Sequence, residues 1–233
     1  MITRPRKQAA GLAEALERLG ATVSVVPLIE IEPVALDSAS VEAYDWIVFT
    51  SASGVRAVRD QLVDGLPDGV RIAAVGPATA DACRGFGAEP SFVPDVYAAE
   101  EIAAGLGLLD GRRVLLPQAD IASPRLAEEL RTQGAIVDAV IAYYAVAVEP
   151  SPAEVAQLEG GIDAILLASG SAARSLARLS KSVPQVGAAL LVCIGPKTAD
   201  VARKVGLEVG LVAHEATSEG IIHALTSHFG ENE

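Results

Sequence analysis

The stretch DWIVFTSASGV, Asp45 to Val55, decides how this chain folds. It begins with a continuous apolar run, Trp46 to Phe49, which is typical of a strand buried on both faces of a parallel sheet. The run breaks at Thr50, and a helical pattern follows. Polar side chains at this break are therefore predicted at the carboxyl end of a strand and the first turn of a helix. Open α/β sheets bind ligands there, and free helix amides can hold an anion.

The same stretch returns further along the chain as Asp163 to Ala173, and other segments repeat with it. The segments 74–81 and 193–200 share the pattern Gly-Pro-x-Thr-Ala-Asp, and LAEAL at 12–16 returns as LAEEL at 126–130. The chain is therefore an internal duplication in which strands alternate with helices. This order predicts an α/β fold with parallel sheets and right-handed crossovers. Further strands are expected at 22–27 and 91–93.

Two extended segments, about 29–36 and 142–149, occupy matching places in the two copies. Either each half folds alone, with a boundary at 107–112, or these segments carry the chain to a second domain and back. The junction at 107–112 has only an ordinary turn length. Each extended segment has about eight residues, roughly 26 Å at strand rise, and could form a two-stranded bridge. This favours one domain made of 1–35 with 147–233 and another made of 36–146.

Composition excludes several classes of protein. The chain has 233 residues, 51% of them hydrophobic, and a formal net charge of −12 without any run of Lys or Arg. Nucleic acid and anionic membranes are therefore poor partners. No apolar run approaches the roughly 20 residues of a membrane-spanning helix, and we expect no signal segment. We expect a cytoplasmic protein with buried, reduced Cys83 and Cys193. The spacing of His214, His223 and His228 fits no metal signature.

Six motifs follow one another along nearly the whole chain: Thr3–Pro5, Asp45–Val55, Val75–Ala80, Leu115–Pro117, Ala142–Val146 and Ile194–Thr198. In this order and spacing they resemble the uroporphyrinogen-III synthase family. The resemblance implies two flavodoxin-like parallel-sheet domains joined by a two-stranded extended linker. It also implies that the first domain is split between the two ends of the chain, which agrees with the division into 1–35 with 147–233 and 36–146.

The resemblance implies an activity as well. The family closes hydroxymethylbilane, a linear tetrapyrrole with many carboxylates, to uroporphyrinogen III in tetrapyrrole biosynthesis. Water leaves, the last pyrrole ring is inverted through a spiro intermediate, and no cofactor or metal takes part. We expect a monomer. The alternative is a non-catalytic two-lobed sensor that closes on a tetrapyrrole or another anion. Relatives fused to DNA-binding modules make this alternative plausible, but no basic helix-turn-helix segment follows in this sequence.

The resemblance assigns roles to individual residues. Tyr143, in the second linker segment, would donate a proton to the leaving hydroxyl. The alternative is an aromatic side chain that packs on a domain face. Tyr144 is adjacent on the same predicted strand, so only one of the two can face the substrate. The substrate carboxylates would be bound by hydroxyls, helix amides and cations at strand ends, namely Arg4, Ser51, Ser53, Thr79, Ser169, Lys197 and Thr198. Ordinary helix capping and solvated surface charge are the alternatives.

Overall fold

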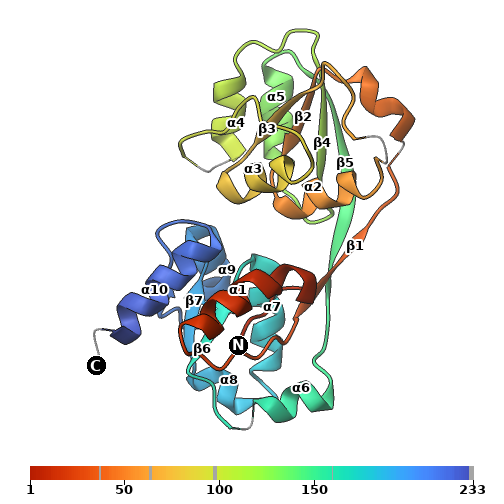
Figure 1. The fold of residues 1–233 in the computed structure, drawn as a ribbon. Coiled ribbons are helices and arrows are strands. Elements are labelled where there is room, and N and C mark those ends of the chain that lie inside the picture. Colours follow the sequence, from red (N-terminus) through yellow and green to blue (C-terminus); the bar gives the residue numbers. More distant parts are fainter. Residues whose placement is uncertain (37, 63–64, 97–98, 159, 231–233) are drawn as a thin grey trace. The chain divides into compact units, whose positions relative to one another are not determined.

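The computed structural model describes residues 1–36, 38–62, 65–96, 99–158 and 160–230. Its contacts divide the chain into two compact units (Figure 1). Unit 1 contains Met1–Glu30 and Val146–Glu233, and unit 2 contains Ile31–Ala145. The described helices include none that is long and apolar enough to cross a membrane.

Unit 2 is built on a parallel sheet in which β2 (Trp46–Phe49) lies between β3 (Arg71–Ala74) and β4 (Arg113–Ala119). β5 (Ile136–Ala147) pairs in parallel with β4, and β1 (Ile29–Pro33) follows at the edge. The backbone bonds Val34 N to Ala142 O and Val148 N to Leu28 O show that β1 and β5 run antiparallel.

Helices cover both faces of this sheet, because successive residues of the apolar run point to opposite sides. Trp46 and Val48 pack against α4 (Ala99–Leu106) and α5 (Arg125–Thr132). Ile47 and Phe49 pack against α2 (Ala52–Arg59) and α3 (Pro77–Arg84). A short 3-10 helix, Ser38–Ala43, precedes β2. The stretch Asp45 to Val55 thus supplies an inner strand of a sheet that is covered on both faces, as its continuous apolar run predicts.

Unit 1 repeats this plan with β6 (Ala164–Leu167), β7 (Leu190–Cys193) and β8 (Leu211–Val212), which pair in parallel in that order. One face packs against α7 (Gly170–Leu179) and α9 (Pro196–Lys204), and the other against α1 (Arg6–Arg18) and α10 (Ser218–Gly230). The short helices α6 (Pro152–Gln157) and α8 (Pro184–Ala188) complete the unit.

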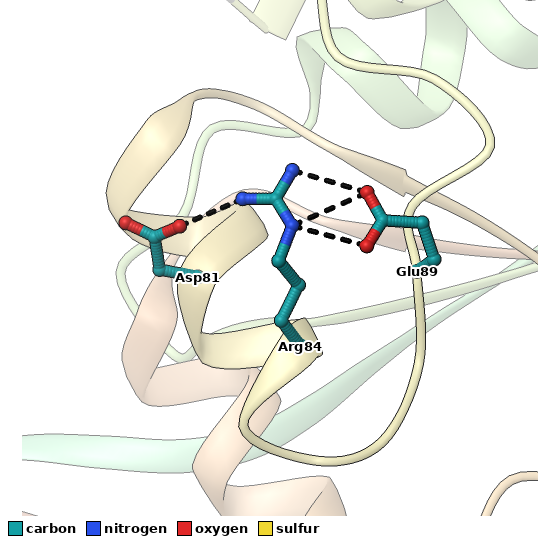
Figure 2. Close-up of polar contacts among 3 residues, drawn as sticks. All are labelled: Asp81, Arg84 and Glu89. Carbon is teal, nitrogen blue, oxygen red and sulfur yellow. Dashed lines mark hydrogen bonds and ion pairs between the residues drawn. The ribbon is translucent and has the colours of Figure 1, made fainter.

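The expected strands at 22–27 and 91–93 are wrong, because each is reduced to one bridge. Val25 bridges to Ile2, and Phe92 bridges to Ala73. Each segment keeps a few further backbone bonds to its neighbour, such as Val26 N to Ile2 O and Ser91 N to Ile72 O, but these are too few for a continuous ladder. The loop that carries Phe92 is instead held by Arg84 at the end of α3 (Figure 2). Its guanidinium contacts Asp81 Oδ1 at 2.7 Å and Glu89 Oε2 at 3.0 Å. These groups are exposed, so solvent screens the attraction, and they mainly restrict the loop.

Candidate functional site

A β-bulge decides which of the two adjacent tyrosines is buried. Gln118 of β4 lies opposite Ile141, but the next residue, Ala119, lies opposite Tyr143. Ala142 is therefore an extra residue in β5, and a bulge of this kind re-aims the side chains beyond it. Ala142 and Tyr143 are consequently both buried, at 0% and 7% exposure, whereas Tyr144 is 43% exposed.

The Tyr143 side chain lies against the first turn of α2. Its ring packs with Ala57 of that helix, and its hydroxyl lies 2.9 Å from Ser51 Oγ. Ser51 is the N-cap of α2, and its Oγ accepts a hydrogen bond of 3.0 Å from Gly54 N. A Cβ atom at Gly54 would lie 3.2 Å from Pro117 O and 3.8 Å from Tyr143 Cε1. The contact with the Pro117 carbonyl would be tight and the contact with the ring ordinary, so the glycine lets the start of α2 lie close to β4.

The surroundings of Tyr143 keep its phenol protonated. Burial raises the pKa of Tyr143, the hydrogen bond with Ser51 lowers it, and the negative charge of Asp120 raises it; the net shift is upward. Asp120 follows β4 directly, and its backbone N–H donates to Tyr143 O at 3.3 Å. Since an unperturbed tyrosine already titrates near pH 10, the Tyr143 phenol is protonated at neutral pH and has a proton to donate.

The other candidate residues of unit 2 lie at the same carboxyl edge of the sheet. Ser53 is half-buried in the first turn of α2, two residues after the N-cap. Thr79 is the third residue of α3, which begins at Pro77 directly after Gly76. Its side chain is only 4% exposed, so it packs beneath the helix start. The structure therefore brings Ser51 and Tyr143 into contact, and it places Ser53 and Thr79 at neighbouring helix starts.

The candidate residues of unit 1 occupy the corresponding edge of its own sheet. Ser169 is the N-cap of α7 and accepts from Ala172 N at 3.2 Å. Lys197 is exposed at the start of α9, and Thr198 beside it is 7% exposed. Arg4 Nη1 donates to Ser218 Oγ, at the start of α10, at 3.0 Å. Both cations of the candidate set thus belong to unit 1, and its single phenol belongs to unit 2.

Asp120, Gly54 and Ser218 also belong to these sites, although the sequence does not single them out as site residues. Asp120 carries a usable signal, because it lies just beyond the apolar run of β4, where ligand sites form. In the described part of the chain, His, Cys, Asp and Glu side chains form no group of three or more that could hold a metal ion. The independence of the reaction from cofactors stays a prediction.

Comparison with known proteins gives one consistent family. The family described as Uroporphyrinogen-III synthase HemD matches residues 10–223. The uroporphyrinogen-III synthase of Synechococcus elongatus is 26% identical over 97% of this chain and 93% of its own length. The porphyrin biosynthesis protein HemD of Ruminiclostridium josui is 28% identical over 100% of this chain but only 49% of its own length. This chain therefore spans about half of that relative.

Solved structures show the same fold. A mutant uroporphyrinogen III synthase of Thermus thermophilus superposes with a TM-score of 0.64 at 18% identity, over 99% of this chain and 98% of that one. The uroporphyrinogen-III synthetase of Helicobacter pylori gives a TM-score of 0.67 at 18% identity, over 89% and 94% of the two chains. These similarities establish a mixed α/β fold with parallel sheets.

Proposed function

We propose that this chain, which belongs to the uroporphyrinogen-III synthase family, closes hydroxymethylbilane to uroporphyrinogen III and inverts the last pyrrole ring. Members of this family are cyclising lyases of tetrapyrrole biosynthesis. The relatives named here carry synthase or porphyrin-biosynthesis names, which favours the enzyme over a non-catalytic sensor. The observation that carries the proposal within this chain is the buried phenol of Tyr143 at the start of α2.

The two compact units support a plan of two flavodoxin-like domains, one of residues 1–35 with 147–233 and the other of 36–146. The antiparallel pairing of β1 and β5 supports the two-stranded linker between them. Each unit carries its candidate residues at the carboxyl edge of its sheet, which is the ordinary place for a ligand in this class of fold.

Tyr143 is the proton donor of the first step. The bond between the terminal methylene carbon of hydroxymethylbilane and its hydroxyl breaks, and the electron pair leaves with oxygen. That oxygen takes the phenol proton and departs as water, leaving a cation on the pyrrole methylene and a phenolate on Tyr143. Help of this kind is typically worth about 10²–10⁴-fold. Ring closure later releases a proton from the carbon that is attacked, and this proton restores the phenol.

The remaining candidate residues hold the folded substrate. Arg4 and Lys197 supply positive charge for its carboxylates. Further contacts come from the hydroxyls of Ser53, Thr79, Ser169 and Thr198 and from the helix-start amides of α2, which Ser51 caps. Holding the two ends of the linear tetrapyrrole near each other supplies much of the selectivity, because positioning removes the entropic cost of bringing these ends together. The net charge of −12 disfavours nucleic acid and anionic membranes as partners, and we propose a cytoplasmic monomer.

Separation of product isomers tests the proposal directly. Fresh hydroxymethylbilane is supplied with and without the protein, and the oxidised porphyrins are resolved chromatographically. The protein should yield isomer III, whereas the spontaneous reaction yields the uninverted isomer I. Saturable binding of the tetrapyrrole with formation of isomer I alone would instead support the sensor.

A further inference from the structure

The hydrogen bonds around Ser51 form a chain that ends at the Tyr143 phenol. Gly54 N–H donates to Ser51 Oγ at 3.0 Å, and Ser51 Oγ lies 2.9 Å from the Tyr143 hydroxyl oxygen. The second bond has two possible directions. If Tyr143 donated, its proton would be held by Ser51 and would not be available to a substrate. If Ser51 donates, the phenol proton is free.

Local electrostatics favour Ser51 as the donor. The amide of Gly54 polarises the serine hydroxyl, because successive hydrogen bonds in a chain strengthen one another. The start of α2 also carries partial positive charge, which favours negative charge on the phenol oxygen. Both effects grow as Tyr143 gives up its proton. The chain therefore stabilises the phenolate more than the phenol, which is the condition for accelerating a reaction.

The duplication provides an internal comparison. Ser169 caps α7 in unit 1 just as Ser51 caps α2 in unit 2, with bonds of 3.2 Å and 3.0 Å to the helix amide. The Ser51 hydroxyl also contacts the phenol of Tyr143. Among the described residues, Ser169 makes the cap bond but no contact with a phenol. Capping is the role that the serine has in both copies. The contact with Tyr143 is an additional feature that the structure shows for Ser51.

We propose that Ser51 is a positioning residue, which donates its proton to the Tyr143 oxygen and so directs the phenol proton toward the leaving hydroxyl. This inference rests on the proposed function. It replaces the expectation that Ser51 chiefly binds a substrate carboxylate, since the Ser51 oxygen accepts from Gly54 and, in the proposed direction, the Ser51 proton goes to Tyr143 rather than to the substrate.

The charged groups around Tyr143 are few. α2, the end of β4 and β1 pack against it. α2 carries Arg56 and Arg59, and β1 carries Glu30 and Glu32. Of the ionised groups in the described residues, Asp120 at the end of β4 is the one that shifts the pKa of Tyr143. A change in the titration of Tyr143 can therefore be assigned to Ser51 when Asp120 is left in place.

The test follows Tyr143 directly in the full chain. Tyrosine labelled with ¹³C at Cζ is titrated by NMR without substrate, and the Tyr143 signal is assigned by Tyr143→Phe. Ser51→Ala should raise the pKa of Tyr143, because a donor to the phenolate is lost. Ser51→Thr should restore it, since threonine keeps both the hydroxyl and the cap. Ser169→Ala removes the matched cap and should leave this titration unchanged, whatever it does to substrate affinity.

Kinetics provide the second readout. Ser51→Ala should lower kcat about 10- to 100-fold, the range for a hydrogen bond to a charged group, with little change in KM, and Ser51→Thr should recover most of the loss. Ser151→Ala, which removes the remote cap of α6, should lose stability but keep kcat.

An unchanged Tyr143 titration in Ser51→Ala, or a rise in KM alone, would overturn the proposal and return Ser51 to substrate binding. Because the titration needs no substrate, this failure is distinguishable from failure of the synthase activity, which appears as isomer I in the wild type.

Discussion

Replacing Tyr143 by Phe removes one oxygen atom and tests whether the phenol is the proton donor. The hydroxyl contacts Ser51 Oγ at 2.9 Å, and Ser51 keeps its bond from the Gly54 amide when that oxygen is gone. Loss of one neutral hydrogen bond should lower the free energy of unfolding by about 0.5–1.5 kcal/mol. Since 1 kcal/mol lowers Tm by roughly 2–4 °C in a chain of this size, the variant should stay folded under assay conditions.

The loss of activity should be much larger than this loss of stability. A general acid contributes about 10²–10⁴-fold, and a donor that acts only in the transition state affects kcat more than KM. The assay is steady-state formation of isomer III by wild type, Tyr143→Phe and Tyr144→Phe. Tyr144 is the matched control, because it is adjacent in β5 but 43% exposed, and its replacement should leave turnover near that of wild type.

Two outcomes would refute this reasoning in different ways. Near-normal turnover in Tyr143→Phe, with loss of turnover in Tyr144→Phe, would show that the catalytic role belongs to the neighbouring tyrosine. Normal turnover in both variants would show that Tyr143 is structural. Catalysis would then rest on holding the substrate in a folded conformation.

Three further predictions concern charge, thiols and packing. Asp120→Asn should lower the pKa of the Tyr143 phenol, because the negative charge of Asp120 raises that pKa. The alkaline limb of the pH profile of kcat should therefore move to lower pH, opposite to the shift expected for Ser51→Ala. An unmoved limb would contradict this prediction. Burial raises the pKa of Cys83 to about 12 and of Cys193 to about 11, so iodoacetamide should label the folded chain slowly near pH 8, where free thiols react readily; fast labelling without denaturant would refute it. Gly105→Ala should cost about 1–3 kcal/mol in urea unfolding, because a Cβ there would overlap the Phe92 ring; wild-type stability would show that the ring moves freely.

Apolar periodicity predicted much of the fold because burial dominates the formation of the sheets. The run Trp46 to Phe49 has no polar interruption, and the structure buries it on both faces as β2. The internal repeat likewise predicted parallel α/β architecture, and the family resemblance is confirmed. The prediction of strands at 22–27 and 91–93 was wrong, because strand propensity does not reveal whether a neighbouring strand offers enough residues to pair with. That depends on the length of the sheet edge, which is a property of the tertiary structure.

The orientation of Tyr143 could not be obtained from alternation along β5. Strict alternation places Val140, Ala142 and Tyr144 on one face and Tyr143 on the other. The extra residue at Ala142 instead buries Tyr143 on the same side as Ala142. This bulge is defined by the pairing with Gln118 and Ala119 of β4, so the sequence of β5 by itself carries no sign of it. The resemblance to the family selected Tyr143 where periodicity could not choose, and its catalytic role stays a prediction.

Divergence between the two copies separates two electrostatic requirements of the reaction. Carboxylates of the substrate need cations, and the two candidate cations, Arg4 and Lys197, lie at the carboxyl edge of the sheet in unit 1. The proposed leaving step creates a positive charge on the pyrrole methylene, so a cation beside Tyr143 would oppose that step. Among the described residues, Asp120 is the ionised group that acts on the Tyr143 phenol, and its sign suits that developing charge. Duplication supplied both copies with a capping serine at the same edge, and the bulge in β5 then brought a phenol to only one of them.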